Sequence, residues 1–232
     1  MNSNANEDKK LIMEAQGRKW ERYPVKIHLV AFGEDLIGLV KKYVMPNYQK
    51  GDWLAISEKL VSVCQNNVRH ISTVKAGFLA KTIVKFVKKY PNDIGFSLPE
   101  KMQLAVETSG RLRMVLAIVF GGISKLVGIH GTFWRIAGHR VSEIDGFNPD
   151  SMYPYNEYGI LPPKDPEKVC QEIEDKLGLP AVIIDGNNIN VKIISQSKNT
   201  PTDEKLSRLA LLDNPMGQGA EMTPFIIVRE IK

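Results

Sequence analysis

The sequence predicts a mixed α/β fold, of the α/β or α+β class. Strand-like and helix-like patterns alternate along all 232 residues, as expected when helices pack against a sheet. Hydrophobic residues make up 43% of the chain, which is enough for a substantial core. The longest apolar stretch, MVLAIVFGGI at 114–123, is about half as long as a membrane-spanning helix. The pattern therefore predicts a globular protein with one large domain or two small ones.

The first elements follow from hydrophobic periodicity and from proline and glycine signals. Residues 1–22 are expected to be a polar lead-in, frayed or helical, before a single domain at 23–232. A strand is expected at 23–32, followed by a helix at 33–44 that Pro46 ends. A strand is expected within 51–64, where it leads into an irregular segment, and an amphipathic segment follows at 75–90. A helix is expected after Ser97, with Pro99 in its first turn, and a buried strand or helix at 112–128.

The second half begins with about 30 residues, 131–163, that lack regular periodicity; loops of this length are usually functional. A helix is predicted at 165–178, with Asp165 as its cap, Pro166 at its first position and Gly178 at its end. The remaining expected elements are strands at 181–185 and 189–195, a helix at 202–212, a glycine-containing loop and a strand at 224–230.

Net charge is +5 but uneven, because residues 1–130 hold 20 Lys and Arg against 11 Asp and Glu. Such asymmetry can indicate contact with nucleic acid or a membrane. The lysines of 81–89, however, share one helical face opposite an apolar stripe, which is typical of a solvated helix. No zinc-finger spacing, arginine-rich arm or aromatic RNA-binding motif is present. Neither nucleic acid nor a membrane is therefore expected as a partner.

The cysteines and the amino terminus indicate the compartment. Cys64 and Cys170 are far apart, and such cysteines are more often free buried thiols than a disulfide framework. MNSNANEDKK is polar where a signal peptide would continue into apolar residues. A cytoplasmic location is expected.

Three segments place carboxylate or amide side chains where a strand ends or a loop begins. EIDGFN supplies Asp145 and Asn148, VIIDGNN supplies Asp185, and MGQGAE supplies Gln218 and Glu221. Oxygen ligands from separate loops hold Mg²⁺ and Mn²⁺, and glycines allow backbone amides to approach phosphate. Each segment taken alone is equally typical of an ordinary turn. The P-loop, the dinucleotide fingerprint and zinc-site spacings are absent, so spacing alone supports only a general metal–phosphate hypothesis.

Four longer stretches carry a more specific resemblance. DNPMGQGAEMTPFIIVR, RIAGHRVSEIDG, YPYNEYGILPPKDPEKVCQEI and GDWLAISEKLV together resemble the coenzyme F-420-0:L-glutamate ligase family, and most of all its bacterial members. The resemblance spans roughly residues 23–230. It implies the family's own α/β fold, a homodimer, and a reaction that joins L-glutamate to the cofactor precursor with GTP and a divalent metal.

The resemblance also implies roles for individual residues. The positions that match the family's metal ligands are Asp145, Asp185 and Gln218. The positions that match its nucleotide contacts are Ile27, His28, Leu29, Val30, Glu58, Lys59, Asn148, Gly186, Met216, Gly217, Gly219, Ala220, Glu221, Met222 and Thr223. Two sites for Mg²⁺ or Mn²⁺ are implied, with K⁺ as a further candidate ion and GTP as the co-substrate. No residue is assigned as a general base.

Two interpretations of function follow. The first is a gamma-glutamyl ligase that acts on coenzyme F-420-0 or another carboxylate acceptor through an acyl phosphate. The second is a non-catalytic or repurposed homologue that binds a nucleotide or small anion. The second is favoured by Val63, which replaces a lysine of archaeal members, and by Gln65-Asn66-Asn67, which replaces a triplet ending in Gly-Arg. The turn GNN after Asp185 also departs from the family's usual pair.

Overall fold

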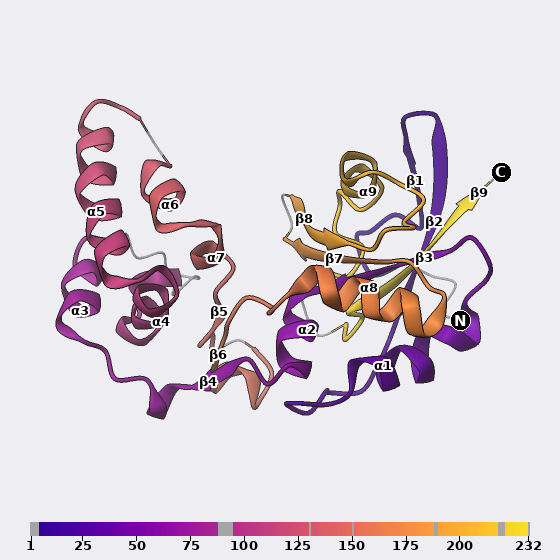
Figure 1. Cartoon of the computed structure of the whole chain (residues 1–232), viewed down its shortest axis with the longest axis horizontal. Coiled ribbons are helices and arrows are strands. Elements are labelled where there is room, and N and C mark those ends of the chain that lie inside the picture. The colour runs from indigo at the N-terminus through magenta and orange to yellow at the C-terminus, as the bar shows by residue number, and fades with distance from the viewer. Residues whose placement is uncertain are drawn as a thin grey trace. The chain divides into compact units, whose positions relative to one another are not determined.

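A computed structural model describes residues 5–87, 95–129, 131–149, 151–187, 190–217 and 221–231. The chain folds into two compact units (Figure 1). We call residues 1–66 and 163–232 the sheet unit, and residues 67–162 the helical unit. The mixed α/β class is confirmed, and no described helix is long and apolar enough to cross a membrane.

A six-stranded mixed sheet forms the centre of the sheet unit, in the order β1-β2-β9-β3-β7-β8. The strands are β1 Ile12–Ala15, β2 Arg18–Val25, β3 Trp53–Ser57, β7 Ala181–Gly186, β8 Val191–Gln196 and β9 Phe225–Ile231. β3 and β7 run parallel, and all other neighbours in the sheet run antiparallel. The strands expected at 181–185, 189–195 and 224–230 are therefore present, with β8 beginning at Val191.

The amino-terminal segment differs from the expected lead-in. β1 and β2 form a hairpin whose turn residues Gln16 and Gly17 have φ values of 53° and 74°, as two-residue hairpin turns require. The strand expected at 23–32 instead begins at Arg18 and ends at Val25. The helical or frayed expectation was wrong because pairing with β9 supplies the backbone hydrogen bonds and buries Trp20 and Arg22, although the segment's composition is polar.

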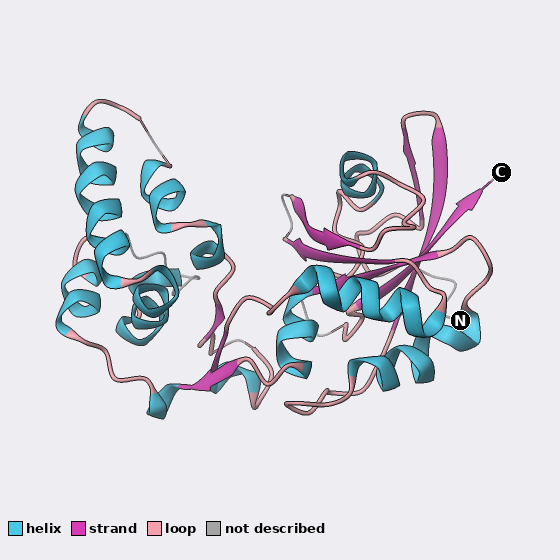
Figure 2. Cartoon of the chain, viewed as in Figure 1, coloured by secondary structure: helices cyan, strands magenta, loops and turns pink. Residues whose placement is uncertain are grey.

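Among the described residues of the sheet unit, four helices cover the sheet: α1 Leu36–Leu39, α2 Glu58–Cys64, α8 Pro166–Leu177 and α9 Glu204–Ala210. In Figure 2, α1, α2 and α8 lie on one side of the sheet and α9 on the other. Strand residues of both parities are buried, for example Leu54 and Ala55 on β3, because each face has a helical cover. The core on the α9 side contains both Trp20 and Trp53.

Local signals explain where these helices begin. The Asp35 side chain accepts from the amides of Ile37 and Gly38 at 3.0 Å, so α1 starts after it rather than at residue 33. α1 continues as a π-helical turn at Val40–Val44 and a 3₁₀ turn at Met45–Asn47, so Pro46 lies inside the last turn. The helices expected at 165–178 and 202–212 are confirmed as α8 and α9. Asp165 precedes α8, but its side chain does not cap the helix, because the residue has a left-handed backbone conformation. α2 replaces the irregular segment expected after β3, because its apolar residues pack on the sheet.

The helical unit contains a three-stranded sheet and five helices among its described residues. The strands are β4 Val68–His70, β5 Asp145–Gly146 and β6 Tyr158–Ile160, in the order β4-β6-β5. The helices are α3 Phe78–Val84, α4 Pro99–Ser109, α5 Arg111–Leu126, α6 Thr132–Ala137 and α7 His139–Ser142, with 3₁₀ turns at Ile71–Thr73, Gly95–Ser97 and Tyr155–Glu157. One hydrophobic cluster, which includes Met102, Met114 and Phe147, joins these helices.

Two expectations for the helical unit need correction. Segment 131–163, expected to be largely loop, contains α6, α7, β5 and β6, because short elements leave too few residues for a periodic pattern. Segment 112–128 was expected to be buried. It is the helix α5, in which only Met114 and Ala117 are fully buried. The helix after Ser97 is confirmed as α4, with Pro99 at its first position.

Candidate functional site

The register of the sheet gathers most of the predicted nucleotide-site residues at one end of the sheet unit. Ser57 of β3 is level with Ile184 of the parallel strand β7, so Glu58 and Asp185 follow at the same end. Phe225, the first residue of β9, is level with Ile56 and with Val25, the last residue of β2. The loop before β9 and the segment after β2 therefore reach the same end. We call this the site end of the sheet.

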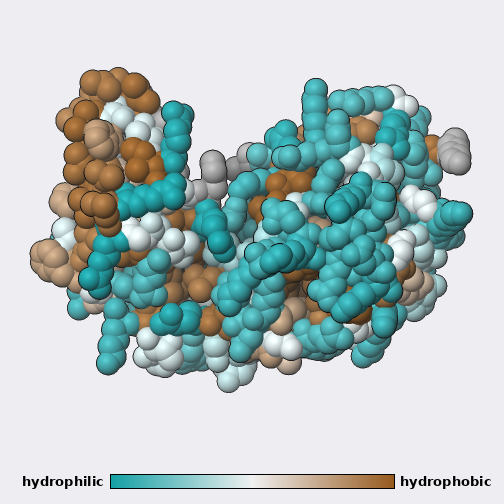
Figure 3. All heavy atoms as spheres, in the orientation of Figure 1, coloured by the Kyte–Doolittle hydropathy of each residue, from teal (hydrophilic) through white to brown (hydrophobic). Residues whose placement is uncertain are grey.

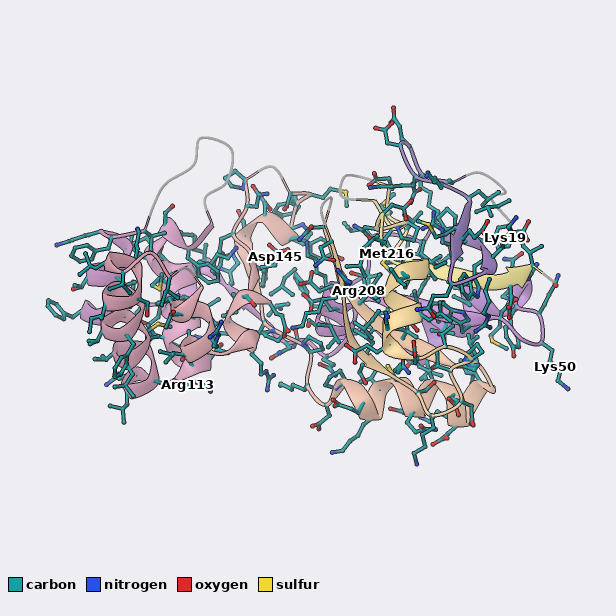
Figure 4. The ribbon with its side chains drawn as sticks, turned by 90° about the horizontal axis from the view of Figure 1, so that it is seen from above. Lys19, Lys50, Arg113, Asp145, Arg208 and Met216 are labelled. Atoms are coloured by element: carbon teal, nitrogen blue, oxygen red, sulfur yellow. The ribbon has the colours of Figure 1, made fainter. Side chains whose placement is uncertain are left out.

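The site end has the character of the ligand-binding end of an open α/β sheet, where loops follow the carboxyl ends of parallel strands. Asp185 is half-buried there, directly after four buried apolar residues of β7. The turn after it is held by Arg208 of α9, labelled in Figure 4. Arg208 donates to the Asn190 side chain at 2.6 Å and to the Val191 carbonyl at 2.9 Å. Arg208 could not be predicted from the sequence pattern, because its contact joins two elements that are separate in the chain.

The loop that leads into β9 is anchored by a buried ion pair. Arg22 of β2 is fully buried and donates to both carboxylate oxygens of Asp213, with an Nη2–Oδ2 distance of 2.9 Å. The same guanidinium donates to the carbonyls of Lys10 and Ala210. Burial acts to raise the pKa of Asp213, but the hydrogen bonds and charge of Arg22 outweigh it and hold that pKa below its usual value. Asp213 is therefore a charged anchor for the residues that follow it.

Further hydrogen bonds hold the described residues of this loop. Thr223 Oγ1 donates to the Met216 carbonyl at 2.8 Å, and Asn214 Nδ2 donates to the Gly217 carbonyl at 3.0 Å. Asn6 donates to Thr223 Oγ1 and to the Pro215 carbonyl, both at 2.8 Å. The amino-terminal residues thus contact the site loop, which their polar composition did not predict. Met216 is buried within this network and is labelled in Figure 4.

Two glycines at the site end lie in close contact with side chains of the protein itself. A Cβ on Gly186 would lie 2.8 Å from Asn214 Oδ1, and a Cβ on Gly217 would lie 2.6 Å from Glu221 Oε1. Gly217 also has a φ of 80°, which favours glycine, and its amide donates to the Asn214 carbonyl at 3.1 Å. The expectation that glycines here let backbone amides approach phosphate stays a prediction, and the Gly217 N–H bonds within the loop in this structure.

Segment 26–30 leaves β2 at the site end and contacts the same loop. The Ile27 amide donates to the Met222 carbonyl at 3.0 Å. Ile27 and Val30 are buried, whereas His28 and Leu29 are exposed, so only the latter two present their side chains at the surface. His28 is held by Tyr43 Oη at 2.6 Å from Nδ1 and by Glu34 at 3.0 Å from Nε2.

Glu58 and Lys59 are the first two residues of α2, at the site end, and their side chains differ in solvent exposure. Glu58 is buried in the first turn of the helix, where a negative charge is favourable, and Lys59 is exposed. Ser57 precedes them, and its amide donates to the Pro224 carbonyl at 2.9 Å, which joins β3 to the start of β9. Of this pair, Lys59 is the residue whose side chain lies at the surface.

Asp145 and Asn148 belong to the helical unit. Asp145 begins β5 (Figure 4), and its Oδ1 accepts from the Gly146 amide at 2.7 Å and lies 3.9 Å from Lys101 Nζ. A Cβ on Gly146 would lie 2.0 Å from the Tyr158 carbonyl oxygen, so this position needs glycine. Asn148 is exposed in the turn that follows. Lys101, a largely buried cation beside a predicted metal ligand, was missed because the pattern of α4 shows only its apolar face.

Some predicted residues lie outside the described part of the chain. These are Gln218, Gly219 and Ala220, so their predicted contacts stay predictions. Within the residues that the structure describes, no group of three or more His, Cys, Asp or Glu side chains is arranged to hold a metal ion. Carboxylates that bind Mg²⁺ commonly do so one or two at a time, with water and substrate phosphates as the other ligands. Asp185 and Asp145 each carry carboxylate oxygens of the kind used in that mode of binding, and their roles as metal ligands stay predictions.

Comparison with known proteins identifies the family. The model of a protein family described as F420-0:Gamma-glutamyl ligase matches residues 24–188 of this chain. Among curated proteins, none matches the chain. The matched range begins near the end of β2 and ends just after Asp185, so it includes both carboxylates predicted as metal ligands. Because the match covers most of the sequence and agrees with a mixed α/β fold, the chain belongs to this gamma-glutamyl ligase family.

Proposed function

We propose that this protein is a gamma-glutamyl ligase that adds L-glutamate to coenzyme F-420-0 or a related carboxylate, using GTP and Mg²⁺ or Mn²⁺. The observation that carries the proposal is the convergence of Asp185, Lys59 and the anchored loop before β9 at one end of the sheet. Family membership supports a ligase role, and the donor types at this end suit a metal–phosphate substrate.

The proposed reaction has two steps. A carboxylate oxygen of the acceptor attacks the terminal phosphorus of GTP, which forms an acyl phosphate and releases GDP. The amine of glutamate then attacks the acyl carbon, an amide bond forms and phosphate leaves. The amine proton passes to a phosphate oxygen or to solvent, so the protein needs no dedicated base. The exposed ammonium of Lys59 would hold the phosphates in place by charge.

Asp185, Asp145 and Gln218 are the residues proposed to hold the metal ions, with K⁺ as a further candidate ion. A bound divalent ion would neutralise the phosphate charge that otherwise repels the attacking carboxylate. Lys101 beside Asp145 would supply a fixed positive charge next to that ligand. Nucleotide contacts are proposed for the exposed side chains of His28 and Leu29 and for the loop from Met216 to Thr223. A homodimer is part of the same proposal.

The decisive experiment measures both products. Purified protein is incubated with coenzyme F-420-0, L-glutamate, Mn²⁺ and either GTP or ATP, and mass spectrometry detects the nucleoside diphosphate and the glutamyl product. GDP and glutamylated cofactor are expected to appear in equal amounts. Metal-dependent binding of GTP without either product would favour the non-catalytic interpretation. Absence of both binding and product would refute the proposal.

Asp185→Asn tests the metal role with nearly the same side-chain volume. We expect activity to fall at least 100-fold and metal-dependent GTP binding to be lost, while the thermal midpoint of unfolding stays close to that of the wild type. Asp165→Asn is the matched control, because Asp165 lies exposed at the start of α8 in a left-handed conformation that asparagine tolerates. Equal loss in both variants would show that the effect is not specific to Asp185, and unfolding of Asp185→Asn would show that Asp185 has a structural role instead.

A further inference from the structure

α5 is apolar on two opposite sides, and only one of them is covered. Met114 and Ala117 are fully buried in the helical unit, and Gly121 packs so closely on α6 that a Cβ would lie 3.0 Å from Phe133 Cβ. The opposite side, which we call the α5 outer face, exposes Leu112, Val115, Leu116, Val119, Phe120, Ile123 and Leu126. Each of these side chains is between 41% and 88% exposed.

This face is unusual for a protein surface. Brown, hydrophobic atoms gather over α5 in Figure 3, and the apolar surface continues into the next turn with Val127 and Ile129. A helix that is hydrophobic all round is normally buried, and a large contiguous apolar patch marks a site of interaction. The 16 residues of α5 extend about 24 Å, so the face is a long stripe and not a pocket.

The charges around the α5 outer face indicate what covers it. α5 carries Arg111, Arg113 and Lys125 and no acidic residue. Residues 67–162 hold 12 Lys and Arg against 7 Asp and Glu, a net charge of +5, which equals the net charge of the whole chain. The helical unit therefore carries the entire excess of positive charge. A surface that has anionic groups above an apolar interior complements both this charge and the apolar stripe.

A second copy of the helix fits less well. Leu112, Leu116, Val119, Ile123 and Leu126 follow the alternating spacing of four and three residues at which paired helices meet. Paired helices, however, carry opposite charges beside that seam, whereas here the flanking Val115 and Phe120 are apolar. Every charge on α5 is positive, so two copies would repel in either orientation.

We propose that the α5 outer face binds in the plane of an anionic lipid bilayer. In such binding the apolar face of a helix enters the boundary between headgroups and acyl chains, and basic side chains contact the headgroups; no spanning helix is required. The same unit exposes two aromatic side chains together with lysines, Phe78 and Phe86 with Lys81 and Lys85, a combination typical of membrane-surface segments. The proposal does not depend on the ligase reaction.

Vesicle flotation of the full-length protein tests this inference. We expect at least tenfold more protein to float with vesicles of 30% phosphatidylglycerol in phosphatidylcholine than with phosphatidylcholine alone, and 0.5 M salt to weaken the binding. Leu116→Glu should reduce flotation at least tenfold. Ile12→Glu is the matched control, because Ile12 is a similarly exposed apolar residue on β1 of the sheet unit, and it should leave flotation unchanged.

A charge variant provides independent evidence if Leu116→Glu proves unstable. Arg111→Gln combined with Lys125→Gln should weaken flotation by about fivefold for each charge removed. No flotation of the wild type, equal flotation with neutral vesicles, or flotation unchanged by Leu116→Glu would each overturn the proposal. A dimer in light scattering that Leu116→Glu dissociates would also overturn it, because a second copy would then cover the face. Failure of the ligase assay would leave these results unaffected, since that assay uses soluble substrates.

Discussion

The anchor of the site loop gives the sharpest prediction, for the variant Asp213→Asn. This change keeps the shape of the side chain and removes the negative charge that Arg22 pairs with. Arg22 is fully buried, and its guanidinium would keep its hydrogen bonds to the carbonyls of Lys10 and Ala210 but lose its counter-ion. The variant therefore leaves a buried cation without compensating charge.

The expected cost follows from the geometry. Removal of one partner of a buried ion pair destabilises a protein by about 3–5 kcal/mol. The Asp213 side chain is 25% exposed, so water screens part of the interaction and the lower limit applies. We expect Asp213→Asn to lower the free energy of unfolding of the sheet unit by about 3 kcal/mol at pH 7.

The pH dependence of this difference has a fixed sign. Because the pKa of Asp213 in the folded state lies below its value in the unfolded chain, the unfolded state binds more protons as the pH falls. The stabilisation is complete above the unfolded pKa, about 4, and is lost as the pH falls through the folded pKa. The gap between wild type and variant should therefore be constant from pH 5 to 8 and should shrink below pH 4.

Urea unfolding followed by tryptophan fluorescence measures the effect, because Trp20 and Trp53 are both buried in the core of the sheet unit. Glu172→Gln is the control, since Glu172 forms an exposed ion pair with Lys176 on α8 and should unfold at the wild-type midpoint. A loss below 1 kcal/mol at pH 7, or a gap that persists unchanged at pH 3, would refute the assigned role of the Arg22–Asp213 pair.

Two further predictions concern close packing and thiol burial. In urea unfolding, Gly217→Ala should destabilise the protein more than Gly17→Ala. Both positions have positive φ, but only at Gly217 would the added Cβ lie 2.6 Å from Glu221. Equal effects would show that the Glu221 side chain moves aside without loss of stability. Burial raises the pKa values of the Cys64 and Cys170 thiols to about 12. A thiol reagent at pH 8 should therefore modify both cysteines at least 100-fold more slowly in the folded protein than in urea. Fast modification of the folded protein would show that the thiols are accessible.

Local sequence signals were sufficient to predict a helix when the residues that begin and end it lie within or directly beside it. α8 was predicted from Pro166 and Gly178, and α4 from Pro99, because capping and proline geometry act over a few residues. The central strands were predicted from short apolar runs. The site residues were implied by resemblance. The register places Asp185, Lys59 and the loop before β9 at the same end of the sheet, and their roles stay predictions.

Other features depend on contacts between segments that are far apart in the chain. The amino-terminal hairpin forms because β9 pairs with β2. The described residues of the site loop are held by two contacts across about 200 residues of sequence, Arg22 with Asp213 and Asn6 with Thr223. Periodicity shows that a helix is apolar but not which of its sides the fold covers, so burial was expected for α5 where the structure exposes a face. The sequence by itself determined the class, the main elements and the family. Only the tertiary structure decided the register that assembles the site end and the apolar face that α5 leaves exposed, because both depend on long-range packing.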